Sequence, residues 1–187
     1  MLAKICIFSK VVATSIGQLL TNCLSVYGPE VEMPLLLEIT GLVELSLSVA
    51  MKSASHSSIK PYLLFVHKFI ANHGSKIELH STVDAAHSVI QNAARNLMLM
   101  SYEGVRNDVT QDIAPPMFDT LSACAKLCPL FLLSLSREDQ PSGEIINSSI
   151  ETASVTLQSN EVDVAQSSIR FLTQLVSHSL QNNSLYE

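Results

Sequence analysis

Apolar residues along this chain recur every three or four positions, and no stretch alternates between apolar and polar residues for the length of a strand. A period near 3.6 residues indicates helices that bury one face, whereas a period of two would indicate strands. Turn-forming residues separate the apolar segments at intervals typical of packed helices. We therefore predict an all-α fold. The expected helices span about residues 3–26, 30 or 34 to 51, 58–72, 75–100, 118–132, 144–158 and 162–181.

Glycine and proline mark several of the expected helix ends. Gly28 can adopt the left-handed conformation that closes a helix, and Pro29 cannot continue one. Pro34 and Pro61 suit the first turns of the helices that follow them, because no amide donor is needed there. Gly74 follows His73 and predicts the end of the helix over 58–72.

Three further breaks are expected in the middle of the chain. The helix over 75–100 is open to a break near residues 81–82, where serine and threonine are adjacent. Residues 102–114 are polar and are followed by Pro115 and Pro116, so they predict the longest loop. Pro129 removes an internal donor and predicts a kink or a restart in the helix after that loop.

The segment from Pro34 to Met51 has an unusually broad apolar face and predicts a helix buried on more than one side. Its spacing is also that of a leucine-rich nuclear export signal, which docks apolar anchors into a groove. The anchors would be Leu36, Ile39, Leu42, Leu45 and Leu47. Because any core helix shows the same spacing, we favour the core interpretation.

The last two expected helices form an antiparallel pair joined by the short polar turn 159–161. Residues 118–127 and 164–172 begin helices about 46 residues apart, within the repeat length of HEAT-type proteins. We therefore predict an α-solenoid of antiparallel helix pairs, of the HEAT or armadillo kind. Because the chain starts with an apolar Met1-Leu2-Ala3, we expect residues 1–187 to be one segment of a longer solenoid.

Composition supports a folded chain that binds other proteins. Hydrophobic residues make up 47% of the 187 positions and charged residues only 15%, which excludes disorder. The net charge is −6, and the 11 lysines and arginines do not cluster. This balance argues against nucleic acid or an anionic membrane surface as the ligand. A basic or neutral protein partner fits better, and we expect neither a nucleic-acid nor a membrane partner.

The four cysteines, Cys6, Cys23, Cys124 and Cys128, lie in apolar helical stretches and are interpreted as reduced core thiols. Glu38 interrupts the longest apolar stretch, so no transmembrane helix is predicted. Both features favour the cytoplasm and nucleus.

Candidate chemistry is sparse in this sequence. Cys124 and Cys128 lie four residues apart, so two thiolates could share a zinc ion if two more ligands converged on them. The histidines nearby in sequence match no zinc spacing; they are His67, His73, His80 and His87. No nucleophile elbow, phosphate-binding glycine loop or zinc-protease motif occurs. We predict a protein that is not an enzyme and has no cofactor.

The candidate binding residues are Glu144 and Glu151. They lie two helical turns apart on one face, opposite the apolar residues of the same helix. On the inner side of a solenoid this face could bind a basic protein. The alternative is an ordinary solvated polar face, which the sequence favours.

Residues 159–176 resemble a repeat near the C-terminal end of importin-β superfamily receptors of the transportin-SR and importin-thirteen type. The closest similarity is Ser168-Ile169-Arg170-Phe171-Leu172. Residues 117–129 are similar to the family's helix that ends at a proline-bounded turn, and residues 11–27 are more loosely similar.

This resemblance implies a protein-binding segment of a nuclear import or export receptor. Full-length members bind cargo proteins, the GTPase Ran and nucleoporins. Ran is gripped mainly by N-terminal repeats, so we expect no Ran site in this segment. The arginine-rich cargo helix of transportin-SR proteins is missing, since Arg95, Arg106, Arg137 and Arg170 are scattered. The alternative is a stand-alone helical scaffold or adaptor with no transport role.

Overall fold

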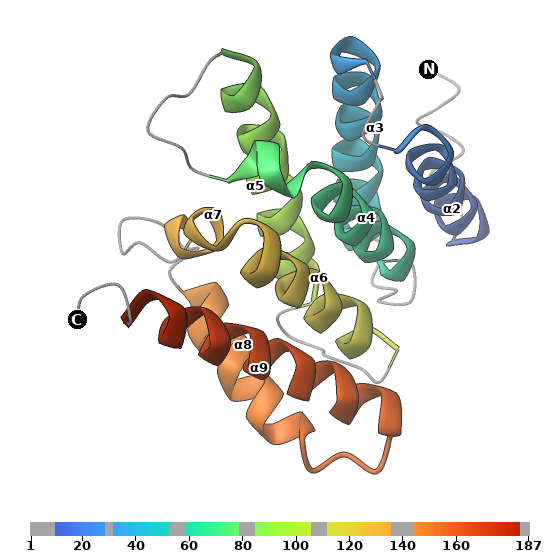
Figure 1. Cartoon of the computed structure of the whole chain (residues 1–187). Helices are drawn as coiled ribbons and strands as arrows, with labels where there is room; N and C mark the ends of the chain where they lie inside the picture. The colour runs from blue at the N-terminus through green and yellow to red at the C-terminus, as the bar shows by residue number, and fades with distance from the viewer. Residues whose placement is uncertain are drawn as a thin grey trace.

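The computed structural model describes residues 10–28, 32–52, 59–78, 85–105, 112–135 and 144–183 (Figure 1). This part of the chain consists of eight helices and contains no strand, so the all-α prediction is confirmed. The helices are α2 (Lys10–Tyr27), α3 (Met33–Lys52), α4 (Lys60–Ile77), α5 (Ala85–Val105), α6 (Ala114–Leu127), α7 (Pro129–Ser134), α8 (Glu144–Thr156) and α9 (Val162–Asn183).

Several predicted helix ends are confirmed. Gly28 follows α2 with φ of 58°, the left-handed conformation that glycine adopts without a steric penalty. Pro34 and Pro61 lie in the first turns of α3 and α4. The predicted break at Pro129 is also present, because α6 ends at Leu127 and α7 begins at Pro129 itself. Residues 81–82 lie outside the described part of the chain.

The predicted helix end at Gly74 is wrong, because α4 continues to Ile77. Gly74 lies inside the helix, where a Cβ atom would come within 2.6 Å of the Leu127 Cβ atom. The glycine therefore permits a close approach between α4 and α6 and does not cap the helix.

The polar segment 102–114 also differs from its prediction at both ends. α5 continues to Val105, and Tyr102 packs against the core while its hydroxyl hydrogen-bonds Ser148 of α8. At the other end, α6 begins at Ala114, so Pro115 and Pro116 lie inside its first turn. Proline is compatible with that turn because its missing donor has no helical partner there.

Helices α4 and α6 run parallel to each other. Lys60, at the start of α4, pairs with Asp112, just before α6. Gly74, near the end of α4, lies against Leu127, the last residue of α6. Because the contacts at both ends follow the same order, the two helices point the same way.

Helices α2 and α9 extend the pair of α4 and α6 into a layer of four helices. Gly17 of α2 contacts Pro61 near the start of α4, and the Asn72 side chain, further along α4, donates to the Leu24 carbonyl of α2. On the other side α9 packs along α6 (Figure 1). The Phe171 ring stacks on the Phe118 ring with centroids 5.8 Å apart. Helices α2, α4, α6 and α9 therefore lie side by side in chain order.

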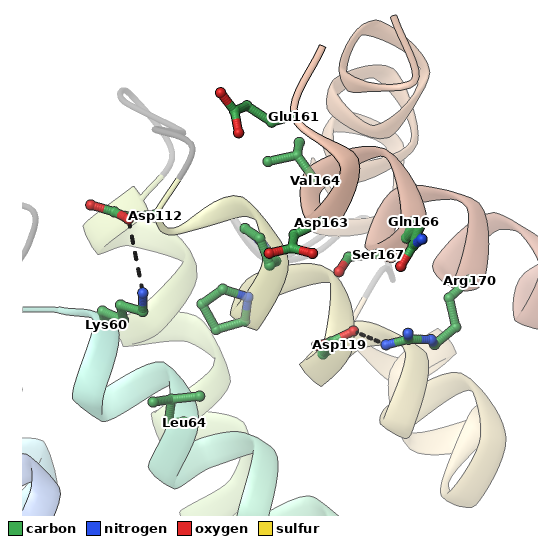
Figure 2. Close-up of a pocket in the computed structure, with 12 residues that line it drawn as sticks. Lys60, Leu64, Asp112, Asp119, Glu161, Asp163, Val164, Gln166, Ser167 and Arg170 are labelled. Atoms are coloured by element: carbon green, nitrogen blue, oxygen red, sulfur yellow. Dashed lines mark hydrogen bonds and ion pairs between the residues drawn. The ribbon is translucent and has the colours of Figure 1, made fainter. Parts of the chain in front are cut away.

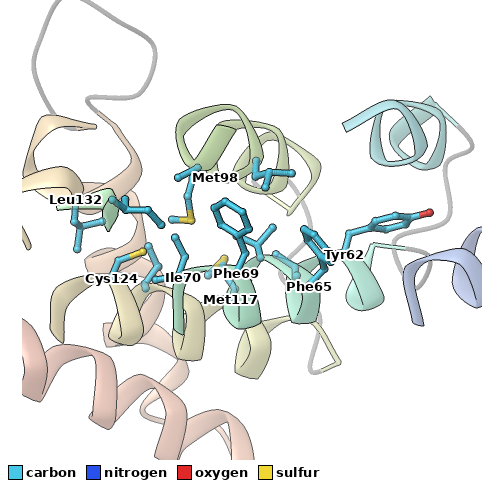
Figure 3. Packing of buried hydrophobic residues seen from close by; sticks show 14 of the residues in the cluster. Tyr62, Phe65, Phe69, Ile70, Met98, Met117, Cys124 and Leu132 are labelled. Carbon is cyan, nitrogen blue, oxygen red and sulfur yellow. The ribbon is translucent and has the colours of Figure 1, made fainter. Parts of the chain in front are cut away.

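The remaining long helices cover this layer. α3 packs against α2 and α5, α5 packs against α3 and α4, and α8 packs against α9. The core lies between α4, α5 and α6, where Phe65, Phe69 and Met117 meet Met98 (Figure 3). Burial of these large apolar side chains supplies most of the stabilisation of the layer.

The prediction that the helix over 34–51 is buried on more than one side is wrong. Leu36, Ile39 and Leu47 are buried, but Leu42 and Leu45 remain 51% and 43% exposed on the opposite face. Because α3 lies at the outside of the described helices, one apolar face has no neighbour in them. Of the five anchors of the export-signal pattern, three thus lie in the core and two lie on the exposed face.

None of the described helices combines the length and the apolar content needed to cross a bilayer.

Candidate functional site

A hollow of about 510 Å³ lies where α4, α6 and α9 begin (Figure 2). Because the three helices are parallel, their first turns lie together at one edge of the layer. The charged residues that line the hollow are Lys60, Asp112, Asp119, Glu161, Asp163 and Arg170. We call this hollow the polar groove.

Local sequence explains why these three helices start beside the polar groove. α4 begins Lys60-Pro61 and α6 begins Ala114-Pro115-Pro116. Proline pre-sets the backbone for a first turn, so each of these helices starts at a defined position. In α9 the first turn contains Asp163. A carboxylate there interacts favourably with the positive end of the helix dipole.

Two ion pairs flank the polar groove. Lys60 Nζ lies 3.9 Å from Asp112 Oδ1, and both side chains are well exposed. Arg170 donates a hydrogen bond through Nη1 to Asp119 Oδ1, which joins α9 to α6 (Figure 2). Exposed ion pairs contribute little stability, so the packing of α4, α6 and α9 holds the groove walls in place.

In the part of the chain that the structure describes, several polar side chains of the groove have no partner, among them those of Glu161, Asp163 and Ser167. Glu161 and Asp163 are exposed and pair with no described cation. Ser167 as a residue is only 5% exposed, and its hydroxyl makes no hydrogen bond to a described residue. In Figure 2 that hydroxyl points toward the groove, between the Asp163 and Asp119 carboxylates.

A second hollow of about 270 Å³ lies on the other side of the Asp119–Arg170 pair. Its lining includes His67, Ser122 and Lys126. The Ser122 hydroxyl and His67 Nδ1 are buried without a hydrogen-bond partner among the described residues. Polar side chains thus continue along α4 and α6 beyond the polar groove.

The predicted binding residues lie elsewhere. Glu151 is exposed on α8, and it does not line the polar groove. Glu144 is the first residue of α8, but its side chain lies outside the described part of the structure. The groove residues Glu161 and Asp163 were not singled out by the sequence analysis, because only the packing of α9 beside α6 brings them to a shared hollow.

The candidate metal and nucleophile residues have the surroundings of core residues. Cys124 and Cys128 are fully buried free thiols, and a hydrogen bond to Cys128 together with burial raises the pKa of Cys124. A raised pKa disfavours the thiolate that metal binding or attack requires. Within the described ranges, no group of three or more His, Cys, Asp or Glu residues is placed to hold a metal ion. Cys6, His80 and the His87 side chain lie outside those ranges.

His73 is buried against Phe69, with ring centroids 5.2 Å apart. Neither ring nitrogen has a hydrogen-bond partner among the described residues. Burial and, secondarily, the charge of Lys76 lower the pKa of His73 to about 4. This imidazole therefore stays neutral near pH 7 and acts as a core side chain.

Comparison with protein-family models, with curated proteins and with solved structures found no match to this chain. The resemblance of residues 159–176 to nuclear transport receptors therefore stays a prediction.

Proposed function

We propose that this chain is a protein-binding segment of an α-solenoid built from antiparallel helix pairs. The observation that supports this most is the parallel order of α2, α4, α6 and α9, in which each helix packs mainly on the next helix of this series. Stacked repeats bury their apolar faces in this way, against sequence neighbours. Such arrays present extended surfaces and hollows between equivalent helix ends, and the polar groove is one of these.

Exposed apolar residues on two outer helices, α9 and α3, support a longer array. On α9 the exposed Val162, Ile169 and Val176 are spaced seven residues apart and form one stripe. On α3 the exposed Leu42 and Leu45 lie on the face opposite the core. Further helix pairs would cover both surfaces, as neighbouring repeats do.

For the cellular role we propose a nuclear import or export receptor acting between cytoplasm and nucleus. The resemblance over residues 168–172 supports this role, because these residues resemble part of a repeat of nuclear transport receptors. Phe171 stacks on Phe118, and the Ser168 hydroxyl bonds Thr156 and the Val164 carbonyl. These residues join α9 to α6 and α8, so the resemblance lies in repeat packing. A cargo protein is the proposed partner, and no Ran contact is proposed for this segment.

An affinity experiment with nuclear extract tests this function. The immobilised chain is expected to enrich cargo proteins or pore components over a bead control. The matched control is a chain in which Phe171→Asp prevents α9 from packing on α6. Failure of the native chain to enrich either class would contradict the receptor role.

Size-exclusion chromatography and urea unfolding distinguish the alternative, a stand-alone scaffold or adaptor. A solenoid segment with uncovered apolar ends is expected to self-associate as its concentration rises. A strictly monomeric chain with one cooperative unfolding transition would favour the adaptor.

A further inference from the structure

The polar groove has more negative than positive charge. Asp112 and Asp119 are each paired with a cation, whereas Glu161 and Asp163 are not paired within the described part of the chain. Four carboxylates against two cations leave a formal charge of −2 in the groove. An incoming cation would therefore be attracted without displacing either existing ion pair.

The helix starts do not favour an anion in this groove. Helix N-termini bind anions through free backbone N–H groups. Here Pro61, Pro115 and Pro116 occupy first-turn positions of α4 and α6, and proline has no N–H to offer. The carboxylates of Glu161 and Asp163 already occupy the positive end of α9.

The unpartnered side chain of Ser167 is a second, independent indication of a ligand. The residue is only 5% exposed, and its hydroxyl points into the groove and has no partner in the described chain. Its oxygen is open to the groove, so a ligand group that enters the groove could form the hydrogen bond that this hydroxyl lacks. The groove volume of about 510 Å³ lies within the range of small-ligand pockets, with room for a long side chain and its backbone.

We propose that the polar groove binds a basic segment of a protein partner, which inserts an arginine or lysine side chain between Glu161, Asp163 and Ser167. This inference rests on the proposed protein-binding function and specifies the chemistry of the partner. The carboxylates accept charge-assisted hydrogen bonds from the cation, and the Ser167 hydroxyl oxygen accepts one more. The Asp119–Arg170 pair closes one end of the binding site.

The test measures fluorescence anisotropy of a short labelled peptide in which arginine alternates with glycine, titrated with the full chain. A second peptide carries citrulline, the uncharged isostere of arginine, at the same positions. The arginine peptide is expected to bind, and the citrulline peptide is expected to bind at least about tenfold more weakly, since charged hydrogen bonds are lost.

Two double variants separate the groove from general electrostatic attraction. Glu161→Gln with Asp163→Asn removes both unpaired carboxylates and is expected to weaken binding of the arginine peptide by about tenfold or more. Glu32→Gln with Glu38→Gln changes the net charge equally at exposed positions just before and within α3. This control is expected to alter binding less than about twofold at moderate salt.

A further variant keeps both carboxylates and protects the test against a folding defect. Gln166 is exposed at the groove, one turn after Asp163, so Gln166→Lys places a cation beside the carboxylates. This lysine is expected to weaken peptide binding while leaving the circular dichroism spectrum and melting temperature unchanged.

Equal losses in the two double variants, or equal binding of the two peptides, would overturn the basic-segment proposal. That result differs from failure of the proposed function. A chain that enriches nuclear partners but shows no groove-dependent arginine binding would contradict only the ligand chemistry. A chain that enriches none would contradict the receptor role itself.

Discussion

The close contact between α2 and α4 gives the sharpest prediction about the helix layer. In Gly17→Ala the new Cβ atom would lie 2.7 Å from the Pro61 Cβ atom, with the Pro61 carbonyl carbon at 3.6 Å. Carbon atoms in contact normally lie about 3.5–4.0 Å apart, so the helices must separate by roughly 1 Å. Pro61 cannot turn aside, because its ring is fixed to the α4 backbone.

The expected change in the free energy of unfolding of Gly17→Ala follows from two opposing effects. Overpacking a buried site costs about 1–3 kcal/mol. Replacing glycine by alanine inside a helix contributes about 1 kcal/mol in the opposite direction. We expect the larger part of the overpacking range because the clash involves rigid atoms, so Gly17→Ala should reduce the free energy of unfolding by about 1–2 kcal/mol.

Gly41→Ala is the matched control. Gly41 is exposed within α3, and a Cβ atom there would meet nothing within 4 Å. This variant should be about 1 kcal/mol more stable than the native chain, because only the helix propensity changes. Urea unfolding followed by circular dichroism measures both variants. If Gly17→Ala is as stable as Gly41→Ala, the described packing of α2 on α4 is wrong.

Three further predictions concern single interactions. The pKa of His73, lowered from 6.5 to about 4, means that below pH 6.5 the unfolded chain takes up a proton that the folded chain excludes. Stability should therefore fall between pH 6.5 and 4 by up to about 3 kcal/mol, and His73→Gln should remove that part of the pH dependence measured by urea unfolding. Replacing Asp119 and Arg170 by alanine, singly and together, should give a coupling energy of only about 0.2–1 kcal/mol in a double-mutant cycle, and a clearly larger value would mean that the pair is more than a surface ion pair. Glu78 accepts a hydrogen bond from the Leu130 N–H at the start of α7. Glu78→Ala should cost about 1 kcal/mol and speed amide hydrogen exchange in α7, whereas unchanged exchange would refute this capping role.

The sequence predicted the fold class because helical periodicity and proline positions are local signals. Gly28 marks a helix boundary through its freedom to adopt a positive φ. Pro61 and Pro129 mark boundaries through the fixed φ and missing N–H of their own rings. The helix end predicted at Gly74 is wrong because a glycine inside a helix can also serve close packing. Its partner Leu127 lies far along the chain, so the pattern around Gly74 contains no sign of that contact.

The candidate site was missed for a related reason. Asp119 and Asp163 lie on different helices. The sequence around each residue predicts only a polar position near the start of a helix. One available signal was the spacing of about 46 residues between 118–127 and 164–172, since repeats of that length stack their equivalent helices side by side. This spacing would place the first turns of the two helices side by side. It would therefore have indicated that the charged residues of both first turns face a common hollow.

Helices α4, α6 and α9 are parallel neighbours whose first turns share one edge, and the polar groove depends on this arrangement. Pulsed electron paramagnetic resonance tests this arrangement by measuring the distance between two spin labels. One chain carries labels at positions 60 and 161, and a second chain carries labels at positions 60 and 177. Both chains lack their reactive native cysteines. Positions 161 and 177 are about 24 Å apart along α9. The 60–161 distance should be much the shorter, because Lys60 and Glu161 line the same groove. A shorter 60–177 distance would mean that α9 runs antiparallel to α4 and would contradict the account.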